Sequence, residues 1–167
     1  MHPLRIKVCG VTNEADARHA ALHGADAVGL NFYPGSPRCV DPGTAGFILR
    51  ELPPFVEAVG VFVELPGGPL RTRSARVLGS LGHQASRSFT RGGTGKTAPW
   101  RLLAGFDPGV PVILAGGLTP DNVAEAVRLV RPYGVDVASG VEHSPGHKDP
   151  DKVRRFIDNA RAAAARL

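Results

Sequence analysis

The chain has 167 residues, of which 43% are hydrophobic and 21% charged, and 20 Lys+Arg against 15 Asp+Glu give a formal net charge of +5. This composition is typical of one globular domain, expected over residues 1–167, and no apolar run approaches the ~18 residues that span a bilayer. The two cysteines, Cys9 and Cys39, are too few for a disulfide framework and lack the spacing of a zinc site. We therefore expect no metal, no membrane partner and a cytoplasmic location.

The positive charge is concentrated in one anomalous segment, residues 65–91. This segment holds no Asp or Glu and five arginines, so the rest of the chain is neutral overall. A loop that binds polyanions and a solvated or disordered stretch are the two alternatives. The segment has one aromatic residue, Phe89, and no RNA-binding motif, so we expect no nucleic-acid partner.

Before this segment the sequence alternates between β-branched runs and amphipathic helical patterns, as βα units do. The first strand is predicted at Arg5 to Cys9 and is followed by a helix that Asn13 caps. The second strand is predicted at Ala25 to Tyr33, and its helix begins at Asp41. The third strand is predicted at Phe55 to Val63.

After the segment the same pattern resumes. Strands are predicted at Val110 to Ala115 and at Gly134 to Gly140, with one helix capped at Thr119 between them and a last helix that begins at Asp149. Strands that alternate with helices pair in parallel through right-handed crossovers. The pattern leaves an open doubly wound sheet and a closed barrel as alternatives.

Six sequence blocks, in this order, closely resemble the phosphoribosylanthranilate isomerase family. The resemblance implies a TIM barrel, of which strands 1–3 and 7–8 are legible here. It also implies the Amadori rearrangement of N-(5-phosphoribosyl)anthranilate, a small sugar phosphate, in tryptophan biosynthesis, by a monomer or homodimer without cofactor. The blocks are KVCGVTNEADA, FYPGSPRCV, LPPFVEAVGVFV, GGTGKT, ILAGGLTPDNVAEA and RPYGVDVASGVEHSPGHKDPDKV.

The resemblance implies catalytic roles for two residues and an anchoring role for a third. Cys9 would be the general base that removes the C2′ proton of the sugar, which requires a thiolate and hence a positive potential that lowers its pKa. Asp136, on the last strand, would support the active site. Arg38 would bind the anthranilate carboxylate, which suits the bidentate geometry of a guanidinium. The alternatives are a core cysteine, a turn-capping aspartate and a solvated loop arginine.

Two small-residue pairs follow the last two strands, where TIM barrels commonly hold phosphate on backbone N–H groups. These pairs are Gly116-Gly117 and Ser139-Gly140. Glycines needed only for tight turns are the alternative. The GGTGKT run, residues 92–97, resembles a phosphate-binding P-loop, but Thr90 stands where that motif needs glycine. We interpret the run as the sixth βα loop of the isomerase pattern.

The resemblance breaks in residues 65–91. A third helix would end at Gly82, and only nine residues, 83–91, then remain for three strands and two helices, which need roughly 40. Strands 4–6 are therefore expected to be missing. The general acid of the family, an aspartate just before the GGTGKT loop, has no counterpart here. The predicted third helix would carry Leu70, Val77, Leu78 and Leu81 on one face.

Three explanations for the anomalous segment remain open: a sequence error or frameshift, a genuine internal deletion, and a half-barrel that dimerises. An open sheet with the strand order 7-8-1-2-3 would leave strands 3 and 7 without a partner on one side. It would also expose the apolar interior of the barrel to water. The sequence thus predicts an isomerase by descent. The alternative is a non-catalytic truncated remnant that binds phosphate or polyanions.

Overall fold

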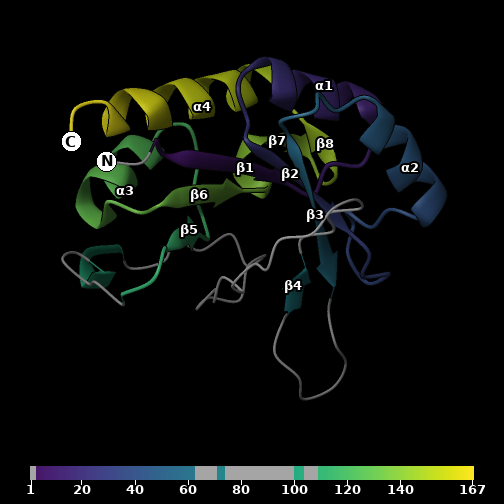
Figure 1. Cartoon of the computed structure of the whole chain (residues 1–167), viewed down its shortest axis with the longest axis horizontal. Helices are drawn as coiled ribbons and strands as arrows, with labels where there is room; N and C mark the ends of the chain where they lie inside the picture. The colour runs from purple at the N-terminus through teal and green to yellow at the C-terminus, as the bar shows by residue number, and fades with distance from the viewer. Residues whose placement is uncertain (1–2, 63–70, 74–99, 104–108) are drawn as a thin grey trace.

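The structure is a computed structural model that describes residues 3–62, 71–73, 100–103 and 109–167. The predicted GGTGKT loop and most of the segment 65–91 lie outside the described residues. Figure 1 shows the elements, which are, in chain order, β1 (Arg5–Cys9), α1 (Glu14–Leu22), β2 (Ala27–Asn31), α2 (Pro42–Arg50), β3 (Glu57–Phe62), β4 (Arg71–Arg73), the 3-10 helix η1 (Trp100–Leu103), β5 (Ile113–Ala115), α3 (Val123–Val130), β6 (Gly134–Val137), the 3-10 helix η2 (Ser139–Val141), β7 (Glu142–Ser144), β8 (His147–Lys148) and α4 (Pro150–Ala164).

Six of these strands form a sheet in the order β4-β3-β2-β1-β6-β5, in which five neighbouring strands run parallel. Strands β7 and β8 pair antiparallel in a separate two-stranded sheet. The five parallel strands lie in the predicted order, because β5 and β6 are the strands numbered 7 and 8 in the family pattern. One expectation is wrong. The third strand is not an unpaired edge, since β4 pairs with it antiparallel. Residues 71–73 therefore form a strand inside the stretch predicted to be a third helix, because their backbone groups complete the ladder of β3.

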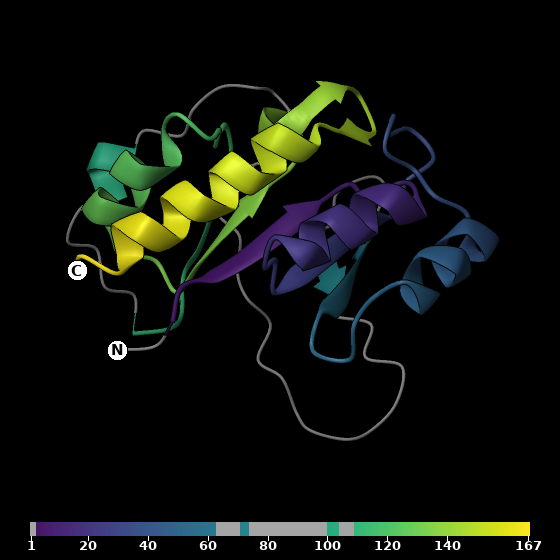
Figure 2. The same ribbon diagram turned by 90° about the horizontal axis from the view of Figure 1, so that it is seen from above.

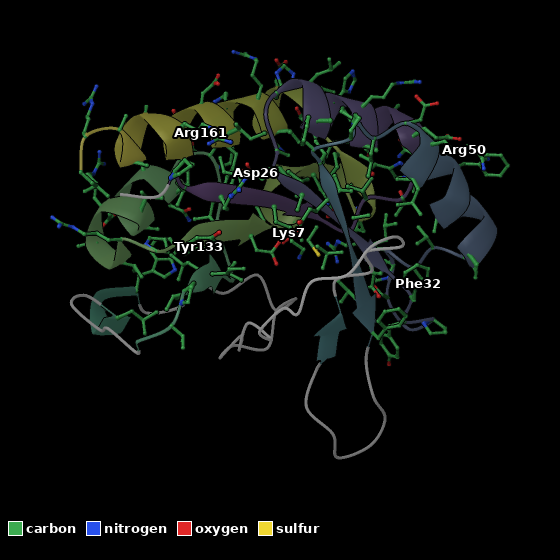
Figure 3. The ribbon with its side chains drawn as sticks, in the orientation of Figure 1. Lys7, Asp26, Phe32, Arg50, Tyr133 and Arg161 are labelled. Atoms are coloured by element: carbon green, nitrogen blue, oxygen red, sulfur yellow. The ribbon has the colours of Figure 1, made fainter. Side chains whose placement is uncertain are left out.

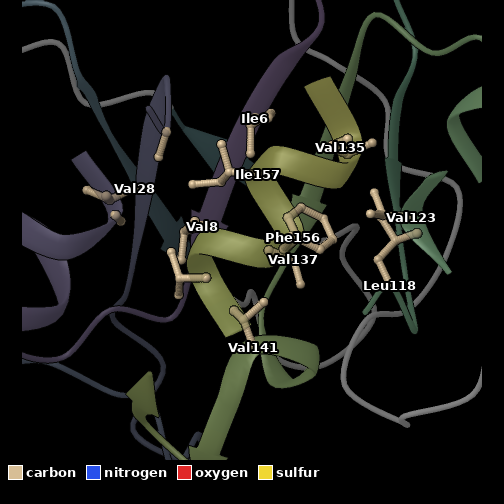
Figure 4. Packing of buried hydrophobic residues seen from close by; sticks show 14 of the residues in the cluster. Ile6, Val8, Val28, Leu118, Val123, Val135, Val137, Val141, Phe156 and Ile157 are labelled. Carbon is tan, nitrogen blue, oxygen red and sulfur yellow. The ribbon is translucent and has the colours of Figure 1, made fainter. Parts of the chain in front are cut away.

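Helices α1, α2 and α4 all lie on one side of the sheet (Figures 1 and 2). Side chains alternate along a strand, so Ile6 and Val8 of β1 point to this side and are fully buried. Phe156 and Ile157 of α4 pack in the same core (Figure 4). Lys7 and Cys9 have the opposite parity and point to the other face. The described strands form an open sheet with no closed barrel.

Helix α4 is tied to the amino-terminal end of the sheet by Arg161. Its guanidinium donates to the carbonyls of Leu4 and Gly24 at 3.1 and 2.9 Å, and lies 3.1 Å from the Asp26 carboxylate. Figure 3 shows Arg161 and Asp26 on the helix side, with Lys7 on the strands below. The loops that follow the strands lie at the opposite, carboxyl-terminal end of the sheet.

Three of the four predicted helix starts are confirmed. The side chains of Asn13, Asp41 and Asp149 each accept a hydrogen bond from a backbone N–H in the first turn of a helix. The fourth prediction is wrong, because α3 begins at Val123 and not at Thr119. The side chain of Asn122 accepts from the Thr119 N–H at 2.7 Å and so holds that residue in the preceding turn.

No helix within the described residues is long and apolar enough to cross a membrane.

Candidate functional site

The predicted site residues gather at the carboxyl ends of the parallel strands. Cys9 is the last residue of β1, Asp136 is the third of four residues in β6, and Arg38 lies in the loop after β2. The glycine pair 116–117 follows β5 directly, and Ser139-Gly140 begins η2 after β6. Because parallel strands end at one edge of a sheet, five separate segments contribute to one region.

Lys7 joins this region although the sequence analysis did not single it out. Lys7 and Asp136 are register partners across β1 and β6, and Nζ of Lys7 lies 2.9 Å from Oδ2 of Asp136. Burial lowers the pKa of Lys7, but the Asp136 carboxylate outweighs this effect and raises it above the ordinary value. Lys7 is therefore charged at neutral pH.

The Cys9 thiol occupies space that a glycine on the neighbouring strand leaves open. Cys9 pairs with Gly29 across β1 and β2, and a Cβ on Gly29 would lie 2.6 Å from the Cys9 sulfur. The position adjacent to Cys9 on this face therefore requires glycine.

The expected lowering of the pKa of Cys9 is not found. Burial raises the pKa of the thiol, the Asp136 carboxylate raises it further, and the nearby ammonium groups of Lys7 and Lys148 lower it by less. The expectation fails because the thiol is buried and because the carboxylate that binds Lys7 also faces Cys9. Cys9 is thus a thiol in the resting site.

Arg38 is held by Glu142, a second residue that the sequence analysis did not include in the site. Nε and Nη2 of Arg38 donate to Oε1 and Oε2 of Glu142 at 2.8 and 2.7 Å. The stem of Arg38 crosses Gly10, where any Cβ would collide with Cδ of the arginine. Gly10 also has a φ of +71°, a conformation that favours glycine. Arg38 therefore lies against the residue that follows Cys9.

Glu142 belongs to a buried polar cluster beneath Arg38. Nζ of Lys148 lies 2.7 Å from Oε1 of Glu142, and the backbone N–H of Lys148 donates to Asp16 at 2.8 Å. Burial raises the pKa of Glu142, but hydrogen bonds from Arg38 and Lys148 outweigh it, so this pKa falls below its ordinary value. Burial lowers the pKa of Lys148. The hairpin of β7 and β8 supplies both residues.

The two small-residue loops lie against each other. A Cβ on Gly140 would collide with the carbonyl oxygen of Leu118, which follows the 116–117 pair. Gly116 and Gly117 have φ values of +96° and +67°, which other residues rarely adopt. The structure therefore brings together the two loops predicted to bind phosphate.

A shallow cavity of about 240 Å³ opens beside these loops. Arg38 and Ser139 are the predicted site residues in its lining; Cys9, Asp136, Gly140 and the 116–117 pair are not part of it. The complete lining consists of Arg38, Ser139, Glu142, His143, Ser144 and Pro145. Within the described part of the chain no cluster of three His, Cys, Asp or Glu side chains could hold a metal ion.

Comparisons with known proteins agree with this arrangement. The family model described as N-(5'phosphoribosyl)anthranilate (PRA) isomerase matches residues 89–159. A relative from Trichlorobacter lovleyi named N-(5'-phosphoribosyl)anthranilate isomerase is 42% identical over 204 aligned positions, which cover 96% of this chain and 99% of the relative. The chain belongs to the phosphoribosylanthranilate isomerase family. A Pseudomonas aeruginosa relative of the same name is 39% identical, over 97% of this chain and 97% of the relative.

Solved phosphoribosylanthranilate isomerases have a similar fold. The enzyme from Thermotoga maritima matches with a TM-score of 0.78 at 34% identity, over 95% of this chain and 99% of that one. The enzyme from Thermus thermophilus gives 0.77 at 30% identity, with the same coverage. A third, in complex with reduced 1-(o-carboxyphenylamino)-1-deoxyribulose 5-phosphate, gives 0.71 at 29%.

The comparison also shows that this chain is shorter than its relative. The 204 aligned positions of the Trichlorobacter lovleyi relative exceed the 167 residues of this chain by 37, so at least that many residues of the relative have no partner here. The family model begins its match at residue 89, near the end of the anomalous segment 65–91.

Proposed function

We propose that the chain is an isomerase that converts N-(5-phosphoribosyl)anthranilate to 1-(2-carboxyphenylamino)-1-deoxyribulose 5-phosphate, an Amadori rearrangement in tryptophan biosynthesis. The observation that carries the proposal is the 42% identity to a relative of that name over 96% of the chain. The site supports it, because a thiol, a carboxylate and a guanidinium converge at the strand ends.

The reaction moves protons and leaves the atom count unchanged. A proton delivered to the furanose oxygen opens the ring, and Cys9 as thiolate then removes the proton from C2′. The resulting enolamine takes up a proton at C1′ and releases the proton of its C2′ hydroxyl, which gives the aminoketose. Asp136 keeps Lys7 charged and bound at 2.9 Å, and the paired Lys7 provides the positive potential that stabilises a Cys9 thiolate when it forms.

Substrate binding follows from the remaining predicted residues. Arg38 binds the anthranilate carboxylate, and backbone N–H groups of Gly116, Gly117, Ser139 and Gly140 bind the 5′-phosphate. The contact between the two loops supports a shared phosphate site. The substrate is a small molecule and the reaction needs no cofactor.

The five parallel strands are proposed to be strands 7, 8, 1, 2 and 3 of a TIM barrel that lacks strands 4–6. The strand order and the 37-position shortfall support this assignment. Residues 1–167 form one domain in this proposal, with the anomalous segment 65–91 inside it. A cytoplasmic location and a monomer or homodimer complete the proposal.

The competing function is that of a non-catalytic remnant that binds phosphate or polyanions. One observation favours it: residues 65–91 contain no Asp or Glu to act as the general acid.

Two measurements separate the functions. The gene is placed in a tryptophan auxotroph that lacks the isomerase, and the purified chain is assayed by the loss of phosphoribosylanthranilate fluorescence. The isomerase function predicts turnover by the wild type. It also predicts turnover ~10²–10⁴-fold lower in the Cys9→Ala variant, because that substitution removes the base. Phosphate binding with no turnover and no growth would establish the remnant.

A further inference from the structure

Arg38 has one edge of its guanidinium occupied and one edge left over. Nε and Nη2 form the side-on edge, and both donate to the Glu142 carboxylate. A guanidinium has five N–H donors, so Nη1 and the second Nη2 hydrogen remain for a second carboxylate. Among the described residues, no hydrogen bond from Nη1 of Arg38 is found.

Glu142 is itself held rigidly. Its side chain is only 4% exposed and lies 2.7 Å from Nζ of Lys148, whose side chain is 1% exposed. Nζ of Lys152 donates to the backbone carbonyl of Glu142 at 2.9 Å. The side chain of Glu142 is thus held by Lys148 and its backbone by Lys152, in addition to the bonds from Arg38.

The charges of this cluster favour an anion. Arg38 and Lys148 both donate to the one carboxylate of Glu142, so these three side chains together carry one net positive charge. Hydrogen bonds from both cations keep the pKa of Glu142 below its ordinary value, so it stays ionised at neutral pH. One further carboxylate would neutralise the cluster.

We propose that Glu142 is a positioning residue: it fixes the side-on edge of Arg38 so that the opposite edge binds the carboxylate of an aryl acid at the cavity lined by Arg38 and Ser139. The inference rests on the proposed function and deepens it. A long arginine side chain loses rotamer freedom when it binds a ligand, and an arginine already held by Glu142 loses less. Glu142 therefore acts through Arg38 and does not touch the reacting atoms.

The test measures binding of 2-aminobenzoate, the aryl acid alone, by fluorescence titration. Glu142→Gln keeps the size of the side chain but presents an amide N–H₂ to one donor of Arg38, so we expect ~10-fold weaker binding or more. Glu51→Gln removes a carboxylate from the exposed Arg18–Glu51 ion pair and should bind like the wild type. In turnover, Glu142→Gln should raise KM by a similar factor and leave kcat within about twofold.

A second variant distinguishes a loss of binding from a loss of folding. Glu142→Asp keeps the charge opposite Lys148 but is one methylene too short for both bonds to Arg38, and it should weaken 2-aminobenzoate binding while keeping the urea unfolding midpoint. Unchanged binding in a folded Glu142 variant, or no binding by the wild type, would overturn the inference. Wild-type binding without turnover would reject the isomerase and leave the role of Glu142 standing.

Discussion

Among the single residues of the site, the charges around the Cys9 thiol have opposing effects on its pKa. Lys7 stabilises a negative charge on Cys9, but Asp136, which neutralises Lys7 at 2.9 Å, opposes it. Gly29 admits the sulfur between the strands and thereby increases its burial. The raised pKa of Cys9 means that the thiol must lose its proton before it can accept one from a substrate.

The pKa of Cys9 can be measured through its alkylation by iodoacetamide, since only the thiolate reacts. In a Cys39→Ala background, the midpoint of the rate against pH should lie above that of an ordinary thiol, because burial and Asp136 raise the pKa. Asp136→Asn should move the midpoint to lower pH, since the charge that opposes the thiolate is removed while Lys7 stays. A midpoint below the ordinary value in the parent would contradict this account of the site.

At the scale of elements, loops after neighbouring strands are locked together by glycine. Gly140 in η2 packs so closely on the loop after β5 that no Cβ fits against the Leu118 carbonyl. By contrast, Gly46 in α2 has nothing within 4 Å of an added Cβ. A side chain added at Gly140 should therefore lower the stability of the protein, whereas one added at Gly46 should not.

Gly140→Ala should destabilise the protein by about 1–3 kcal/mol and abolish phosphate-induced NMR shifts in the loops after β5 and β6, because the backbones must move apart. Gly46→Ala is the matched control and should stabilise by about 0.5–1 kcal/mol, since alanine has the better helix propensity. Urea unfolding measures both. If phosphate shifts in the parent appear only in other loops, the predicted phosphate site is wrong.

At the scale of the whole molecule, the sheet has helices on one side only among the described elements. The other face carries the Lys7–Asp136 ion pair at its centre, together with Ile113, which is 37% exposed. This face therefore carries both charged and apolar side chains. Edge strand β5 pairs with β6 alone within the described residues.

The absence of Asp and Glu from residues 65–91 should limit the rate. Residues 65–91 offer arginines in place of an aspartate, and arginine does not release its proton near neutral pH. We expect turnover at least ~10²-fold below that of the Trichlorobacter lovleyi relative assayed alongside by the same fluorescence loss. Turnover within about tenfold of that relative would show that another group donates the proton.

Local patterns sufficed for most of the elements. The strand at Arg5 to Cys9 and the caps at Asn13, Asp41 and Asp149 follow from hydrophobic period and capping chemistry. The order of the five parallel strands followed instead from the resemblance of the ordered sequence blocks to the family. The start of α3 was misplaced, because the choice between Thr119 and Asn122 depends on one side-chain hydrogen bond. The positions of Cys9, Arg38 and Asp136 at one edge follow from parallel pairing.

The partners of these residues were decided by the tertiary structure alone. Lys7 meets Asp136 across 129 residues of sequence, and Arg38 meets Glu142 across 104. No local spacing in the sequence predicts either pair. The Lys7–Asp136 pair depends on the register of β1 and β6, and the Arg38–Glu142 pair depends on the position of the β7–β8 hairpin. The order of strands and loops along the chain therefore predicts which residues reach the strand ends. The charge around the thiol and the orientation of Arg38 depend on the fold, because electrostatic interactions act through space and not along the chain.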